Sequence, residues 1–148
     1  MNRNQKRSLY SLLIWGTVAL VFVPLFFING GASTWGLDKT RIIITTSFIL
    51  AGFILFFLML VLTRKKNTGG IERDERDMLI SRKASEISLA IVMGYIFFTC
   101  IILYSIYGET NSVPRGWMWF LAYTCFFTGY ISNSAISLIL YRSKANIL

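Results

Sequence analysis

The feature that most constrains this chain is the placement of its charged side chains. No Asp, Glu, Lys or Arg lies within four long windows, at residues 8–37, 42–63, 87–108 and 116–141. All 15 basic and 7 acidic residues therefore fall between or beyond these windows. Each window contains the roughly 20 residues that a helix needs to cross a hydrocarbon core about 30 Å thick. The pattern predicts an all-α bundle of four transmembrane helices and excludes the soluble globular, disordered and coiled-coil classes.

We expect the whole chain, residues 1–148, to form a single integral membrane domain, and its hydrophobic fraction of 55% agrees with that class. The predicted spans cover about 8–29, 41–63, 86–107 and 116–141, with a loop at 64–85 between the second and third spans. The lipid bilayer is therefore the first expected partner.

The distribution of Lys and Arg predicts the orientation of these spans. If the four spans alternate, both termini and the loop at 64–85 share one side, which carries 12 basic residues. The other side carries three, namely Lys39, Arg41 and Arg115. Because basic residues near span ends are retained in the cytoplasm, we expect a multi-pass protein of the cell membrane with both termini cytoplasmic. The net charge of +8 then reflects orientation and attraction to anionic lipid, and we expect no nucleic acid partner.

The first span also has the basic start and apolar run of a secretory signal peptide. Its apolar stretch at 9–28 is longer than the roughly 7 to 15 residues that are usual in such peptides. Cleavage would leave three spans and disturb the charge distribution. We therefore expect the first span to be retained.

The fourth span is the most polar of the four. Cys125, Gly129, Asn133 and Ser137 recur every four residues and form one file along a helix face. Small residues at this spacing allow helices to approach closely, and Asn can hydrogen-bond across the contact. The file is typical of a packing seam, either inside the bundle or between two copies of it. The alternative is that Asn133 and neighbouring hydroxyls line a polar cavity or a conduction path.

The loop at 64–85 holds most of the chemically active side chains. Opposite charges at four-residue spacing, as in Arg82 and Glu86, favour a helix over 71–85. No Pro or Gly separates this stretch from the third span, so we expect an amphipathic extension that runs on into the bilayer. The charged residues predicted to dock a protein partner or anionic lipid are Glu72, Asp74, Glu75, Arg76, Asp77, Arg82 and Lys83.

Residues 74–84, which read DERDMLISRKA, resemble the D-E-R-x-x-x-I-x-x-K-A signature of a family of small prokaryotic four-helix membrane proteins of unknown function. In that family the motif also lies between the second and third spans. The resemblance implies a fold and an orientation, and an accessory or regulatory role beside other proteins. It supplies no catalytic residue.

The inventory of residues sets several activities aside. Without histidine there is no imidazole base or metal ligand, and without charges in the spans there is no proton relay. Cys100 and Cys125 do not form a C-x-x-C pair; they could lie at one depth, but we expect buried thiols. The acidic residues between 72 and 77 could hold a divalent metal, although they alternate with basic residues and are more often paired. We therefore expect neither an enzyme nor a cofactor.

Two functions remain open after this inventory. The first is an accessory or regulatory protein that docks a partner through the charged loop. The alternative is a small transporter or channel, oligomeric because four helices enclose little space, that uses the polar face of the fourth span.

Overall fold

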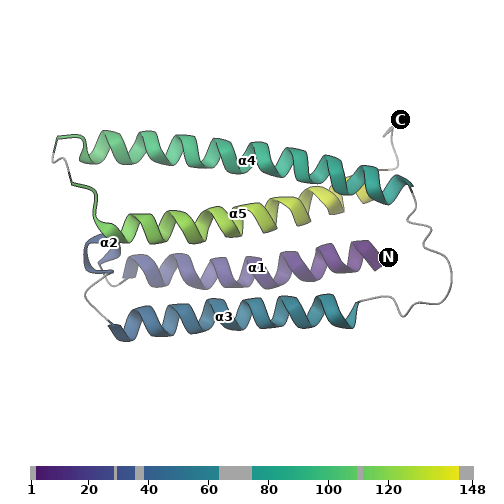
Figure 1. Cartoon of the computed structure of the whole chain (residues 1–148), viewed down its shortest axis with the longest axis horizontal. Helices are drawn as coiled ribbons and strands as arrows, with labels where there is room; N and C mark the ends of the chain where they lie inside the picture. Colours follow the sequence, from purple (N-terminus) through teal and green to yellow (C-terminus); the bar gives the residue numbers. More distant parts are fainter. Residues whose placement is uncertain (1–2, 29, 36–38, 64–74, 110–111, 144–148) are drawn as a thin grey trace.

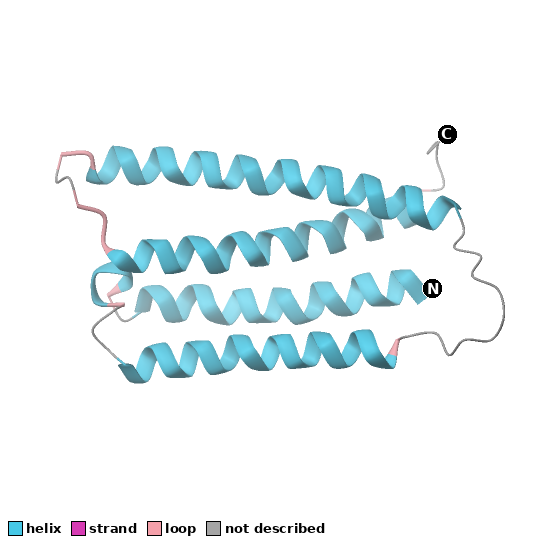
Figure 2. Cartoon of the chain, in the orientation of Figure 1, coloured by secondary structure: helices cyan, strands magenta, loops and turns pink. Residues whose placement is uncertain are grey.

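The computed structural model is helical throughout its regular regions, as Figure 2 shows. It describes residues 3–28, 30–35, 39–63, 75–109 and 112–143. Within these residues the helices are α1 (Arg3–Ile28), α2 (Gly31–Thr34), α3 (Lys39–Leu62), α4 (Glu75–Tyr107) and α5 (Arg115–Arg142). The all-α prediction is therefore confirmed.

The four long helices lie side by side in the order α3, α1, α5, α4 (Figure 1). Each helix runs antiparallel to its neighbours, and the short α2 packs against α1 and against the start of α5. The row places α1 and α5 in the centre, whereas α3 and α4 form its two edges. This arrangement differs from a closed bundle, in which α3 and α4 would also pack on each other.

Three of the helices, α1, α3 and α4, are long and apolar enough to cross a membrane. The 28 residues of α5 extend about 42 Å, which is also sufficient. However, α5 is more polar along its length, and it does not satisfy the same criterion of apolarity. The structure therefore supports three of the four predicted spans, and the fourth stays a prediction.

The edge helices present long apolar surfaces. Exposed side chains on α3 and α4 are mostly aliphatic or aromatic, as at Leu62 and Phe98. In water such surfaces would be unfavourable, whereas a bilayer solvates them. Both edges of the row are therefore suited to contact with lipid.

The interior of the row is aromatic. Trp15, Phe22 and Phe26 of α1 are fully buried. The Trp15 ring lies 4.7 Å from Phe126 of α5, and the Phe26 ring lies 4.6 Å from Phe120. Because lipid tails are as apolar as these side chains, close packing and ring geometry stabilise the contact more than burial does.

Arg41, which the charge count places on the outer side of the membrane, has a buried side chain, with 7% of its surface exposed. Its guanidinium donates to the carbonyl oxygens of Leu25 and Phe26 and lies 4.9 Å from the centre of the Trp35 ring. Those carbonyls belong to the last turn of α1, where no intrahelical donor remains. Arg41 therefore caps α1 and places a cation at the negative end of its dipole.

At the same end of the row, α2 approaches the start of α5 closely. A Cβ added at Gly116 would lie 2.6 Å from Ala32 Cα and 2.8 Å from Trp35 Cβ. Only glycine fits this contact without a backbone shift.

We predict that Arg41→Met lowers the free energy of unfolding by about 2–3 kcal/mol, because two buried carbonyls lose a charged donor. Arg41→Lys should recover part of this loss, since an ammonium group lacks the planar fork of donors. The measurement is SDS-induced unfolding in mixed micelles. Lys39→Met, an exposed cation at the same end, is the control, and an equal loss in that variant would contradict the capping role.

Candidate functional site: a polar cavity at one end of the row

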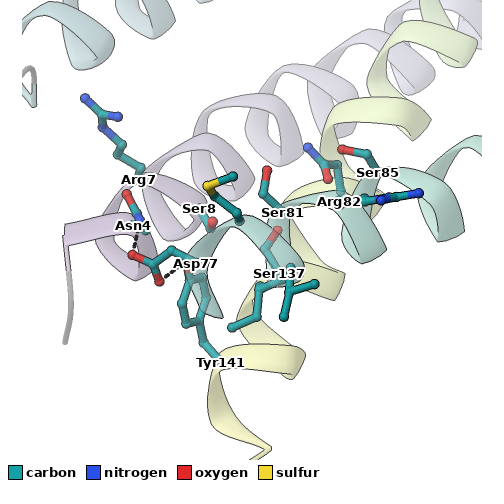
Figure 3. A pocket seen from close by; sticks show the side chains of 13 residues that line it. Asn4, Arg7, Ser8, Asp77, Ser81, Arg82, Ser85, Ser137 and Tyr141 are labelled. Atoms are coloured by element: carbon teal, nitrogen blue, oxygen red, sulfur yellow. Dashed lines mark hydrogen bonds between the residues drawn. The ribbon is translucent and has the colours of Figure 1, made fainter. Parts of the chain in front are cut away.

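A polar cavity of about 590 Å³ lies where the start of α1, the start of α4 and the end of α5 meet (Figure 3). Each helix contributes polar side chains at four-residue spacing, so each presents one polar stripe. These residues are Asn4 and Ser8 of α1, Asp77, Ser81 and Ser85 of α4, and Asn133, Ser137 and Tyr141 of α5. Three stripes from three helices therefore converge on one space.

Asp77 holds the three helices together at this end. Its Oδ2 accepts a hydrogen bond of 2.7 Å from Asn4 Nδ2, and its Oδ1 accepts one of 2.8 Å from Tyr141 Oη (Figure 3). Hydrogen bonds to a carboxylate are stronger than neutral ones, and these two are partly buried. One carboxylate therefore joins α4 to both α1 and α5 at this end of the row.

The deeper part of the cavity is formed by α5. Ser137 is buried, and Asn133 Oδ1 is buried without a hydrogen bond from any described residue. Asn133 precedes Tyr141 by about two helical turns, so it lies about 12 Å farther from the end of the row, measured along the axis of α5. A buried acceptor is costly unless a donor reaches it. The cavity therefore offers a site for a polar group that carries a donor.

Two arginines line the same cavity. Arg7 donates to Thr63 through Nε at 2.8 Å and through Nη2 at 2.6 Å, which links α1 to the end of α3. Arg82 pairs through Nε with Glu86 Oε1 at 3.0 Å, and its side chain is 80% exposed. With two guanidinium groups and the single carboxylate of Asp77, the charge of the lining is positive.

The structure separates the residues that the sequence predicts to dock a partner. Arg76 and Lys83 are exposed on α4, and Arg82 pairs with Glu86 as their spacing predicts. Asp77 instead faces α1 and α5. Glu75 is the first residue of α4, and Glu72 and Asp74 lie outside the described residues. The docking role itself stays a prediction.

The middle of α5 packs against α4 through hydroxyl groups. Ser88 Oγ donates to the Gly129 carbonyl at 3.0 Å and lies 2.7 Å from Ser132 Oγ. Farther along, Tyr95 Oη lies 2.6 Å from Thr124 Oγ1. These contacts form a seam between two neighbouring helices.

The predicted file on α5 is therefore divided along its length. Gly129 lies at the seam with α4, whereas Asn133 and Ser137 line the cavity. Cys125 is half-buried and Cys100 is exposed, so the prediction of buried thiols is wrong, although both are free thiols. The two interpretations of this file, a packing seam and a polar cavity, correspond to two successive stretches of one helix.

The contributions of α1 and α4 to this cavity were not predicted from the sequence. Ser81 and Ser85 follow Asp77 at four-residue spacing, and Asn4 and Ser8 repeat that spacing near the N-terminus. This four-residue spacing of polar side chains could have predicted the two stripes. The charged residues around Asp77 instead favoured a surface helix.

We predict that Tyr141→Phe lowers the free energy of unfolding by about 1–2 kcal/mol, since Asp77 loses one of its two donors. In combination with Asp77→Asn the two effects should not be additive, and a double-mutant cycle measures the difference. Tyr104→Phe removes a hydroxyl from an exposed ring of α4 and serves as the control. Additive effects of the Tyr141 and Asp77 variants would contradict the proposed coupling.

Comparisons with known proteins agree that this is a membrane protein. No curated protein and no solved structure matches the chain. The model of one protein family matches residues 6–145, a range that includes all of the long helices except the first three residues of α1, and all of the cavity lining except Asn4. The chain therefore belongs to the family described as predicted membrane protein, DUF2178.

Proposed function

We propose that this membrane protein is an accessory or regulatory protein of the cell membrane that docks a protein partner through the charged start of α4. The observation that carries the proposal is the continuity of α4, one helix of 33 residues. It presents Arg76 and Lys83 to solvent in its first turns and continues as an apolar helix beyond Glu86. A partner bound at the charged end therefore acts on the same rigid element that spans the membrane.

The contacts of Asp77 support a route from docking to the rest of the row. Asp77 follows Arg76 directly and hydrogen-bonds to α1 and α5. A shift of the first turns of α4 would break or rearrange these bonds and change the shape of the cavity. Binding at the surface and the state of the cavity would thereby be coupled.

We also propose four spans with both termini in the cytoplasm. The length of α5 and its position between α1 and α4 support a fourth span. The hydrogen bonds of Arg7 with Thr63 and of Asp77 with Tyr141 bring four helix ends to one level. Most of the basic residues in the described part of the chain lie at that level, which favours the cytoplasmic side.

We propose binding and not catalysis as the activity of this protein. The cavity is lined by hydroxyl and amide groups, two guanidinium groups and a carboxylate that is already held by two donors. These groups suit recognition, and the proposed function needs no cofactor.

A transport function is the second candidate, because Asn133 and Ser137 line a cavity that extends into the row. The seam hydroxyls of Ser88 and Tyr95 bond within the chain, so a path across the membrane would have to form between copies. This requirement makes the accessory role the better supported of the two.

We predict that Arg76→Glu with Lys83→Glu reduces proximity labelling of the partner in native membranes about tenfold, because both exposed cations reverse their charge. The matched control is Lys39→Glu with Arg115→Glu, an equal reversal at the opposite end of the row. Protease protection verifies insertion of both variants. Equal labelling by the two double variants would contradict docking at α4.

The transport alternative predicts solute flux in proteoliposomes that Asn133→Leu abolishes, because the leucine side chain would block a polar path. The accessory role predicts the same background leak for the natural protein and for Asn133→Leu. Gly94→Leu, at a glycine whose added Cβ would meet nothing within 4 Å, is the control for insertion of a leucine. Flux lost only in Asn133→Leu would favour transport.

A further inference from the structure

We propose that the cavity between α1, α4 and α5 binds the headgroup of an anionic glycerophospholipid whose headgroup carries free hydroxyls. In this site the phosphate lies near Arg82, and a headgroup hydroxyl donates to Asn133. The inference does not depend on the protein partner proposed above.

The charged residues of the lining favour an anion in this cavity. Arg7 and Arg82 line it together with a single acid, Asp77, whose two oxygens already accept hydrogen bonds from Asn4 and Tyr141. These donors offset the negative charge of the carboxylate. The Arg7 guanidinium is directed to Thr63 of α3, so the guanidinium that a ligand would meet is that of Arg82. A cation would be repelled there, whereas a phosphodiester would meet the donors that bind phosphate best.

Arg82 is available for such a contact. Within the described residues its partner is Glu86, bonded through Nε alone, and both side chains are largely exposed. An exposed ion pair of this kind contributes little to stability and is easily exchanged. The two terminal nitrogens of Arg82 can therefore bind phosphate oxygens.

The deeper end of the cavity selects a hydroxyl donor. Asn133 Oδ1 is buried and receives no hydrogen bond from the described residues. Ser8, Ser81 and Ser137 supply further hydroxyls that can donate or accept. A glycerol group, whose hydroxyls also do both, matches this lining better than a choline group, which has no donor.

The position of the cavity selects a lipid as the source of this headgroup. The lining includes the apolar side chains of Met78, Leu79 and Ile80, and α4 continues past it with an exposed apolar face. Polar and apolar walls side by side suit an amphiphile whose acyl chains lie along the helix. The volume of about 590 Å³ is within the usual range for small-molecule sites.

The test is native mass spectrometry of the full chain released from nanodiscs of equimolar phosphatidylglycerol and phosphatidylcholine. We expect retained phosphatidylglycerol in preference to phosphatidylcholine, with an apparent affinity about tenfold lower in Arg82→Gln, which loses a charged phosphate contact. Lys83→Gln removes the same charge one residue away, outside the cavity lining, and should retain the lipid as the natural protein does.

A second variant tests the site without a change of charge. Ser81→Leu places an aliphatic side chain at an exposed position of the lining, so folding is preserved while the space is filled. We expect loss of phosphatidylglycerol in this variant as well. Equal losses in Arg82→Gln and Lys83→Gln, or no preference for phosphatidylglycerol, would overturn the proposal.

Soluble glycerol 3-phosphate carries the same phosphate and hydroxyl chemistry and distinguishes the two sources. A lipid site predicts that millimolar glycerol 3-phosphate leaves the retained phosphatidylglycerol unchanged. Binding of glycerol 3-phosphate that depends on Arg82, without retention of the lipid, would overturn the assignment to a lipid.

Discussion

Helices in a bilayer gain little from hiding apolar surface from one another, so their arrangement depends on close packing and on polar contacts. In this protein the aromatic side chains of α1 supply the packing. The polar contacts are concentrated at the two ends of the row. Arg41 caps α1 at one end, and Asp77 joins α1, α4 and α5 at the other. The order of the helices follows from these end contacts together with the aromatic packing of α1 and the hydroxyl seam between α4 and α5.

The end that Asp77 organises is also where the surface chemistry gathers. Exposed cations on α4, the polar cavity and the link from Arg7 to Thr63 all lie at one level. A partner or a lipid that binds there contacts the helices that set the geometry of the row. This arrangement relates the proposed docking to the proposed lipid site.

The sequence predicted the long helices well, because charge-free windows and helix ends have the same cause, the cost of placing a charge in lipid. It did not predict the order of the row, since four apolar windows give no indication of which helices meet. The charge count placed Arg41 on the outer side of the membrane but gave no indication that its side chain is buried, because such a count takes no account of packing. Asp77 was assigned to a docking surface, whereas the structure gives it partners 73 and 64 residues away in the same chain.

The central claim is that the end of the row where α1 begins and α5 ends is cytoplasmic and contains a cavity that water can enter. The most direct test is the labelling of Asn133→Cys by a membrane-impermeant thiol reagent, in a chain with Cys100→Ala and Cys125→Ala. Ile139→Cys is the control, because Ile139 lies nearer the helix end but is exposed on the apolar surface. We expect residue 133 to react faster than residue 139, and only in inside-out vesicles. Failure of residue 133 to react, or reaction from the outer face, would contradict the account.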